Sequence, residues 1–228
     1  MKQYSFSATF MTLGIVFCTC LILSNLLAAK IFMLGSFALP AAVIIFPVSY
    51  IINDCIAEVW GFRRARFIIW TGFAMNFFVA ALGQLAVLLP PAPFWDGAEH
   101  FNYLFGLAPR IAGASFLAFL AGSFLNAYVM SRMKVVSRGR YFSARAILST
   151  LIGEGVDSLI FFPFAFAGII PFSDMIPMML AQTSLKTLYE ILVLPVTIRV
   201  VNFIKRTEQT DVYDEGISYN ILKVREMA

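Results

Sequence analysis

The sequence predicts an all-α integral membrane protein with six transmembrane helices, and three observations lead to this fold class. The 228 residues are 60% hydrophobic and only 13% charged, whereas soluble domains carry about 25% charged residues. Six apolar stretches are each long enough for the roughly 20 residues that a membrane-crossing helix needs. Several of them nevertheless contain ionisable side chains, each of which costs about 2.5–3.5 kcal/mol near mid-bilayer when it faces lipid. We therefore expect a helical bundle with a polar interior.

The predicted spans are separated by residues that favour turns, namely Gly35, Gly61, the proline-rich run 90–93, Gly139 and Pro171. The first apolar stretch is too long for the core of a secretory signal, so we expect it to remain as a helix. We then expect one six-helix transmembrane transport domain, residues 1–206, followed by a loosely packed cytoplasmic tail, residues 207–228. The expected spans are residues 9–29, 39–60, 66–89, 109–130, 146–168 and 176–203.

The distribution of basic residues predicts the orientation in the membrane. Lys and Arg gather after the second, fourth and sixth spans, whereas Lys30 is the only basic residue between the spans on the opposite side. Cytoplasmic loops carry an excess of Lys and Arg, so both termini are expected in the cytoplasm. These inner loops also account for the net charge of +4, which leaves no basic soluble surface of the kind that binds nucleic acid.

Polar residues recur at similar positions in the two halves of the chain. Asn25 and Asn126, Asp54 and Glu154, and Gln84 and Lys186 are each separated by about 100 positions. Two halves of three helices would have opposite orientations, as in transporters that bind their substrate at the bilayer midplane. A three-plus-three inverted repeat is therefore a possible organisation.

The ionisable and amide residues of the second, fifth and sixth spans form three polar stripes. Residues four positions apart share one helix face, and residues three apart do so as well. Three such stripes can converge on one cavity, which would bind a polar substrate. The stripes are Tyr50, Asp54 and Glu58 with Asn53 beside them, Glu154 with Asp157, and Gln182, Lys186 and Glu190.

A purely structural interpretation of these charges is that they neutralise one another as buried ion pairs. Lys186 could bond Glu190 or Asp54. Arg110 could pair with a further acid, or its side chain could extend to the membrane interface. Glu58 could pair with the nearby cytoplasmic arginines. Five acids then face two bases, so some carboxyls are either protonated or free for a partner that donates hydrogen bonds. Glu58, Arg110 and Glu190 are accordingly candidates for coupling or structural charge partners.

The sequence predicts no metal site and no cofactor. Cys18, Cys20 and Cys55 lie within spans without histidine at metal-ligand spacing, and His100 is the only histidine. Small apolar fillers at helix interfaces are the simplest interpretation of the cysteines. No phosphate-binding loop or nucleophile elbow is present either, so we do not expect an enzyme.

Four separated motifs resemble the queuosine precursor transporter family, a group of vitamin uptake transporter-like membrane proteins. The motifs are NDCIAEVWG at 53–61 with Arg64-Ala65-Arg66, RIAGASF at 110–116, GEGVDS at 153–158, and Lys186. They follow in the family's order and cover nearly all the spans. The chain departs from the family pattern at Ser123 and Asn126, where the family usually has Gln and Asp.

The resemblance implies a six-helix importer of the bacterial inner membrane for 7-deazaguanine bases, such as 7-cyano-7-deazaguanine, 7-aminomethyl-7-deazaguanine or queuine, salvaged for tRNA modification. A carboxylate can accept the two neighbouring donors of a guanine-like edge. Asn53, Gln182 or Lys186 could donate to the O6 oxygen, and Tyr50 or Phe161 could stack on the ring.

Two alternatives compete with this function. The chain could be the substrate-binding subunit of an energy-coupling-factor transporter, although the first span lacks the small residues through which such subunits dock on their ATPase module. It could also be an intramembrane aspartyl protease that uses Asp54 and Asp157, although Asp157 does not follow the second glycine directly. We expect partners to be limited to the lipid bilayer, a small nucleobase and a possible second copy of the chain.

Overall fold

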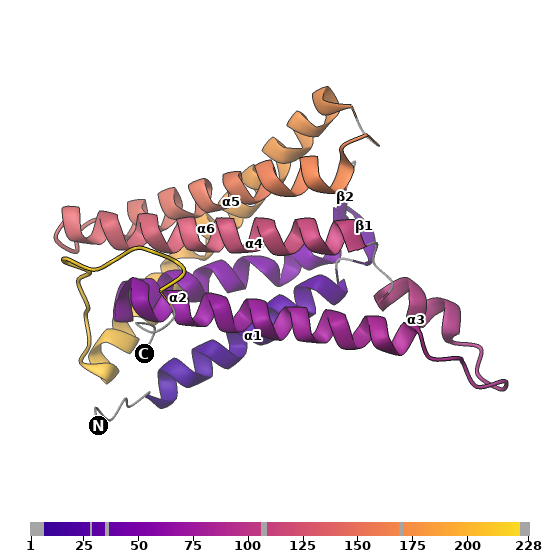
Figure 1. The fold of residues 1–228 in the computed structure, drawn as a ribbon. Helices are drawn as coiled ribbons and strands as arrows, with labels where there is room; N and C mark the ends of the chain where they lie inside the picture. The colour runs from indigo at the N-terminus through magenta and orange to yellow at the C-terminus, as the bar shows by residue number, and fades with distance from the viewer. Residues whose placement is uncertain (1–6, 28, 35–36, 106–108, 169–170, 224–228) are drawn as a thin grey trace.

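The computed structural model describes residues 7–27, 29–34, 37–105, 109–168 and 171–223, and this part of the chain is mostly helical. The long helices lie side by side as a bundle, with a short hairpin and a short helix at one end (Figure 1). The elements are α1 (Ala8–Leu27), β1 (Ile31–Leu34), β2 (Phe37–Pro40), the 3-10 turn η1 (Ala41–Ile44), α2 (Phe46–Val87), α3 (Ala98–Phe105), α4 (Pro109–Val136), α5 (Phe142–Phe166) and α6 (Phe172–Glu208).

The predicted span 39–60 begins later than expected. Residues 37–40 form β2, which pairs antiparallel with β1 from Ile31↔Pro40 to Leu34↔Phe37, and their backbone groups are therefore not available to a helix. The helix starts at Phe46, with Pro47 in its first turn. Proline is well tolerated there, because the first N–H groups of a helix have no partner within the helix. Only residues 39 and 40 of the predicted span therefore lie in a strand, and the apolar segment that could cross a membrane begins with η1 at Ala41.

Element α2 is interrupted where the sequence predicts a break. A straight helix of 42 residues would extend about 63 Å, twice the thickness of the hydrocarbon layer. At Gly61 the backbone leaves helical geometry, with φ 81° and ψ 176°, a conformation that only glycine adopts readily. The chain doubles back at this point, so the two parts of α2 run in opposite directions (Figure 1).

Five helices of the described chain are long and apolar enough to cross a membrane: α1, α2, α4, α5 and α6. Other boundaries differ from the prediction. Helix α4 continues to Val136 and α6 extends from Phe172 to Glu208, because their last turns pack against neighbours that the sequence alone did not reveal. The short helix α3 lies in what was expected to be an outer loop.

The surface and the core both suit a protein in lipid. Aromatic and aliphatic side chains from α1, α2 and α4, including Phe17, Ile56 and Phe119, form the main core. Large apolar side chains such as Phe78, Leu159 and Leu192 point outward and are more than half exposed, which is the pattern of a lipid-facing surface. Together with the apolar helices, this arrangement defines a multi-pass membrane protein.

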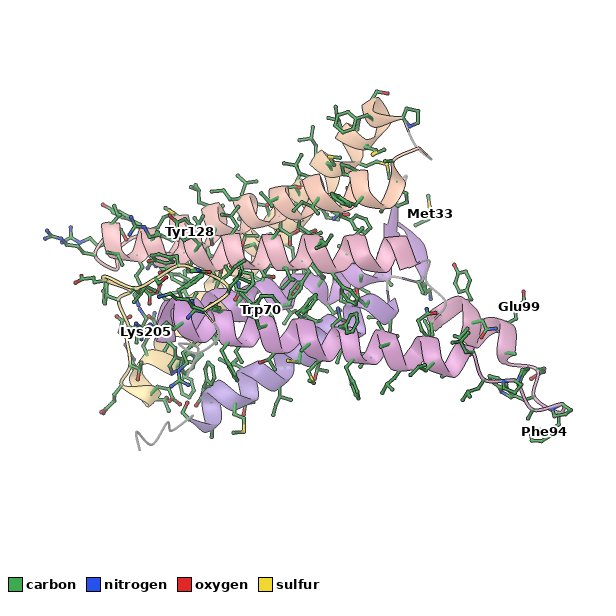
Figure 2. The ribbon with its side chains drawn as sticks, in the orientation of Figure 1. Met33, Trp70, Phe94, Glu99, Tyr128 and Lys205 are labelled. Carbon is green, nitrogen blue, oxygen red and sulfur yellow. The ribbon has the colours of Figure 1, made fainter. Side chains whose placement is uncertain are left out.

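The two ends of the bundle differ in charge. The turn at Gly61, the α4–α5 connection and the end of α6 lie at the same end, which also holds the start of α1 (Figure 1). Lys205 marks this end, whereas Glu99 and Phe94 mark the opposite one (Figure 2). The basic residues that follow alternate spans in the sequence therefore gather at one end of the molecule.

Helices α4 and α5 approach closely at two glycines. A Cβ atom added to Gly153 would lie 2.9 Å from the Gly122 carbonyl oxygen and 2.9 Å from the Asn126 Cβ. Neither neighbour can move without moving its helix. Small residues at such contacts allow helices in lipid to pack closely.

Gly153→Ala is expected to destabilise the bundle by about 1–3 kcal/mol, the usual cost of overpacking, and to lower the melting temperature in detergent. Gly155→Ala is the matched control, because a Cβ there would meet nothing within 4 Å. Equal melting temperatures for the two variants would show that the α4–α5 contact is not tight.

The segment after α6 is packed, contrary to the loosely packed tail that the sequence suggested. Residues 209–223 return across the basic end of the bundle (Figure 1, yellow). The Val212 N–H donates to the Val59 carbonyl at 3.0 Å, and the Trp70 indole donates to the Ile221 carbonyl at 2.9 Å. The expectation failed because these bonds join residues about 150 positions apart.

Candidate functional site

The polar stripe of α2 faces the interior. Tyr50, Asn53, Asp54 and Glu58 are all 2% exposed or less. Their spacing places them along one face of the helix, and this face packs against α4 and α6. The α2 stripe is therefore buried, although the partners of its residues differ from those expected.

Lys186 of α6 is bonded to the two acids of α5. Its Nζ lies 2.6 Å from Glu154 Oε2 and 3.4 Å from Asp157 Oδ2. The same ammonium lies 4.1 Å from the centre of the Phe46 ring, a cation–π distance. The alternative in which Lys186 bonds Glu190 or Asp54 is therefore wrong for this structure, because α5 lies nearer to the ammonium.

Asn53 connects α2 to α4. Its side-chain amide donates to Asn126 Oδ1 at 2.8 Å and to the Ser123 carbonyl at 3.2 Å. Ser123 and Asn126, the two positions at which the chain departs from the family pattern, therefore lie in this region and contact α2. Helix α4 contributes amide and carbonyl groups here, where an acid would have added one more buried charge.

Tyr50 brings the α2 stripe to the same place as the acids of α5. A Cβ on Gly122 would lie 2.7 Å from the Tyr50 hydroxyl and 3.1 Å from the Asp157 Cβ. The hydroxyl has no hydrogen-bond partner although it is fully buried. Residues from α2, α4, α5 and α6 thus surround one region near the middle of the bundle.

Two acids of this region make no hydrogen bond of normal geometry, although the Asn126 amide lies beside the Asp54 carboxylate. All four carboxylate oxygens of Asp54 and Glu190 are buried without a hydrogen bond, and the two side chains are 0% and 1% exposed. Each lies within electrostatic range of the other. Buried polar groups in proteins are almost always bonded, so these oxygens mark a place where a donor is missing.

Glu58 is paired separately, at the basic end. Arg145 of α5 donates to both of its oxygens, at 2.5 and 3.1 Å, and Lys205 of α6 donates to Oε1 at 2.6 Å. Lys134 lies 4.0 Å from the same oxygen. Sequence reasoning missed Arg145 as a partner of Glu58; an isolated arginine in an otherwise apolar stretch was the available signal.

The remaining predicted residues lie at the edges of this region. Gln182 is half-buried one turn before Lys186. Phe161 lies one turn after Asp157 and packs against Phe162 and Phe166, with ring centres 5.5 and 5.9 Å away. The side chain of Arg110 lies outside the described part of the structure.

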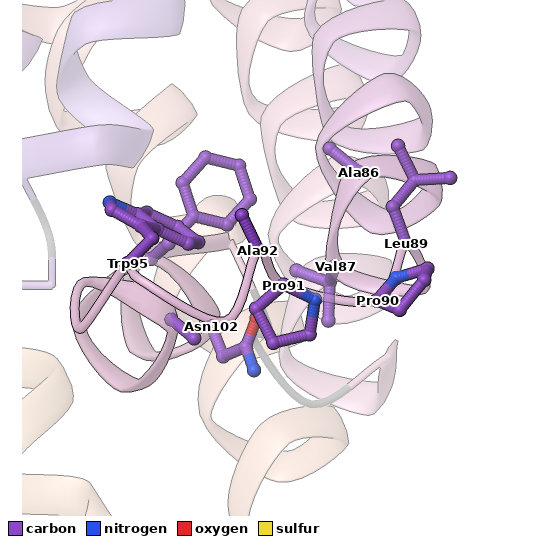
Figure 3. Close-up of a pocket in the computed structure, with 10 residues that line it drawn as sticks. Ala86, Val87, Leu89, Pro90, Pro91, Ala92, Trp95 and Asn102 are labelled. Atoms are coloured by element: carbon purple, nitrogen blue, oxygen red, sulfur yellow. The ribbon is translucent and has the colours of Figure 1, made fainter.

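Neither of two surface pockets coincides with the buried charges. The one in Figure 3, about 240 Å³, is formed by the turn after α2 and includes Trp95 and Asn102. The other, about 340 Å³, lies between α1, α2 and α4 and is mostly apolar. Among the described residues no group of three or more His, Cys, Asp or Glu could hold a metal ion.

A helical multi-pass bundle with acids, amides and a lysine buried at its centre is the architecture of a solute transporter. Residues 40–200 match the family described as "Putative vitamin uptake transporter", and the chain belongs to this family. The match covers both parts of α2 and all the residues of the central region.

Two curated proteins are similar over about half of the chain. A "Probable queuosine precursor transporter" of Bacillus subtilis (strain 168) is 29% identical over 129 residues, 56% of either chain. A "Queuosine precursor transporter" of Escherichia coli (strain K12) is 31% identical over 124 residues, 53% of this chain and 52% of the relative. The matched part therefore spans about half the length of these relatives. No solved structure matches the chain.

Proposed function

We propose that this protein imports queuosine precursors, bases of the 7-deazaguanine type, across the bacterial inner membrane. One observation carries the proposal: buried polar atoms without partners gather around one central region. They include the Tyr50 hydroxyl, Glu154 Oε1, and both carboxylates of Asp54 and Glu190. A planar solute with several donors would supply the missing hydrogen bonds, and the names of the two relatives support this class of cargo.

The groups around the region match a guanine-like edge. Asp54 is free to accept the N1 hydrogen and the 2-amino group together, as carboxylates accept forked donors. Lys186, Asn53 or Gln182 would donate to the O6 oxygen, while Tyr50 and Phe161 offer ring faces. Glu154 and Asp157 complete the proposed site and position the Lys186 ammonium.

The membrane arrangement follows from the two parts of α2. Counting them separately gives six crossings, and we expect from the gathered basic residues that the end with Lys205 faces the cytoplasm. Three helices on either side of the α3 region would then have opposite orientations, as an inverted repeat requires. Asp54 and Glu154 would be corresponding residues of the two halves. We propose that no ATPase module is needed.

Uptake of labelled base tests the proposal. A bacterial strain that neither makes nor imports the base should accumulate it when this chain is expressed, and the purified chain should transport it in liposomes. Asp157→Asn is expected to lower uptake at least roughly thirty-fold, about 2 kcal/mol. It should still fold, because Glu154 retains the shorter bond to Lys186.

Glu99→Gln is the matched control, an exposed acid at the opposite end of the molecule. Wild-type uptake by Asp157→Asn at equal expression would exclude Asp157 from the site. A well-folded chain that takes up no deazaguanine would contradict the proposed function itself.

A further inference from the structure

The segment after α6 is bonded to the basic-end residues of α2, α4 and α6. Asp214 Oδ2 accepts from the Phe62 N–H at 2.7 Å and from the Ser131 hydroxyl at 2.5 Å. Arg66 donates to the Asn220 carbonyl at 2.6 Å. The first contact lies directly after the turn at Gly61, where a Cβ would come within 2.6 Å of the Asp214 carboxylate. The glycine therefore serves both the turn and the docked segment.

Asp211 adds a charged connection between two helices. It accepts from Lys134 of α4 at 2.5 Å and from Lys205 of α6 at 2.9 Å. Burial alone would raise the pKa of Asp211, but the hydrogen bonds from these two lysines outweigh it and hold the pKa below its usual value. The carboxylate is therefore ionised throughout the physiological range, and the connection is permanent unless the segment moves.

This network lies between the central region and the cytoplasmic end. Glu58 is one helical turn beyond Asp54 on the same face of α2, about 6 Å along the axis. Glu58, Arg145 and Lys134 are 1% exposed or less. A solute leaving Asp54 toward the cytoplasm would have to separate these charges, and the lysines that hold Glu58 are the ones that Asp211 fixes.

We infer that residues 209–223 form the cytoplasmic gate of the transport pathway, with Asp211 as its latch. Detachment of Asp211 removes the bridge between Lys134 of α4 and Lys205 of α6, and Glu58 then remains as the ionic connection of Lys205 to α2, so α6 separates more easily from its neighbours. The inference rests on the proposed transport function, but its contacts and its test do not depend on the identity of the cargo. Asp211 is a positioning residue, because it acts through the two lysines.

Cys55 offers a reporter that is already present. It is 2% exposed, next to Asp54, and packs against Val59 of α2 and Val201 and Ile204 of α6. Opening between α2 and α6 at the cytoplasmic end would expose its thiol. A chain with Cys18→Ala and Cys20→Ala retains this reporter alone, and its labelling by a soluble maleimide measures the opening.

Asp211→Asn is expected to speed Cys55 labelling roughly three- to ten-fold, about 0.7–1.4 kcal/mol, because it weakens two partly exposed ion pairs. Deletion of the chain after Glu208 should speed it further. Glu215→Gln is the matched control, because this acid is exposed in the same segment. The ratio of labelling rates between variant and wild type should be the same at about pH 6 and pH 8, because Asp211 stays ionised well above its usual pKa of about 3.9.

A second reporter separates gating from general loosening. Cys20 of α1 is 4% exposed and distant in sequence from the latch, and a chain that retains only Cys20 should label at the same rate with and without Asp211→Asn. Equal acceleration at both cysteines, or no acceleration at Cys55 in either variant, would overturn the gate. Faster Cys55 labelling in a chain that transports no deazaguanine would support the gate and contradict only the proposed cargo.

Discussion

Replacing Asp54 with asparagine is expected to abolish uptake while leaving the protein at least as stable as the wild type. The Asp54 carboxylate is 0% exposed and has no ion-pair partner or hydrogen bond of normal geometry, with only the neutral Asn126 amide beside it. Burying a carboxylate without a partner costs several kcal/mol, so the neutral amide should not lower the melting temperature. In the proposed complex the amide NH₂ would face a donor of the base, and affinity should fall by about 2–5 kcal/mol, at least roughly thirty-fold.

The measurement pairs labelled-base binding with thermal unfolding in detergent. Asp96→Asn removes an exposed acid at the opposite end and should change neither quantity. Tight binding by Asp54→Asn would exclude this carboxylate from the site. A large fall in melting temperature would show that Asp54 has a structural partner, and its unbonded oxygens would then not mark a place for the cargo.

The second large effect is expected for Lys186→Met, which should lose both uptake and stability. Lys186 is the cation bonded to Glu154 and Asp157, and its removal leaves two acids buried without a countercharge. Breaking a buried ion pair from one side costs about 3–5 kcal/mol. We expect a melting temperature several degrees lower and reduced yield in the membrane.

A compensating variant tests the cause of that loss. Lys186→Met combined with Glu154→Gln and Asp157→Asn removes all three charges together, so stability should return while uptake remains absent. Lys30→Met, at an exposed position between α1 and β1, is the matched control. If the triple variant stayed as unstable as the single one, the three residues would not be electrostatic partners.

Asp54→Asn and Lys186→Met therefore distinguish two kinds of buried charge. Lys186 is bonded to two acids of α5, so its loss affects folding. Asp54 has no such ion pair, so its replacement is expected to affect binding of the base and not the stability of the fold. The sequence shows both residues as charges inside apolar spans and does not separate the two cases.

Local pattern predicted much of the fold. Hydrophobic runs and turn residues predicted the helical membrane class and the break at Gly61, and the structure confirms them. Residues 39–45 were assigned to a helix because their composition is apolar, yet residues 39 and 40 pair with β1 and residues 41–44 form a 3-10 turn. Helix α3 is only eight residues long, and so short a helix depends on contacts that a sequence window does not contain.

For the candidate site, helical spacing predicted which residues share a face, but not the partner of each charge. The four-residue spacing of Tyr50, Asp54 and Glu58 was sufficient to place them together on the buried side of α2. The pairing of Glu58 with Arg145 joins residues 87 positions apart, and no local pattern specifies such a distance. The docking of residues 209–223 was missed for the same reason.

The amino-acid sequence by itself determined that this is a helical membrane protein with charges inside, because the cost of exposing polar groups to lipid acts on each span separately. Only the tertiary structure decided which charges are matched: Glu154 and Asp157 share Lys186, Glu58 pairs with Arg145 and Lys205, and Asp54 and Glu190 are in no ion pair. The physical reason is that an ion pair depends on distances of a few ångströms between helices, and those distances are set by the packing of the whole bundle.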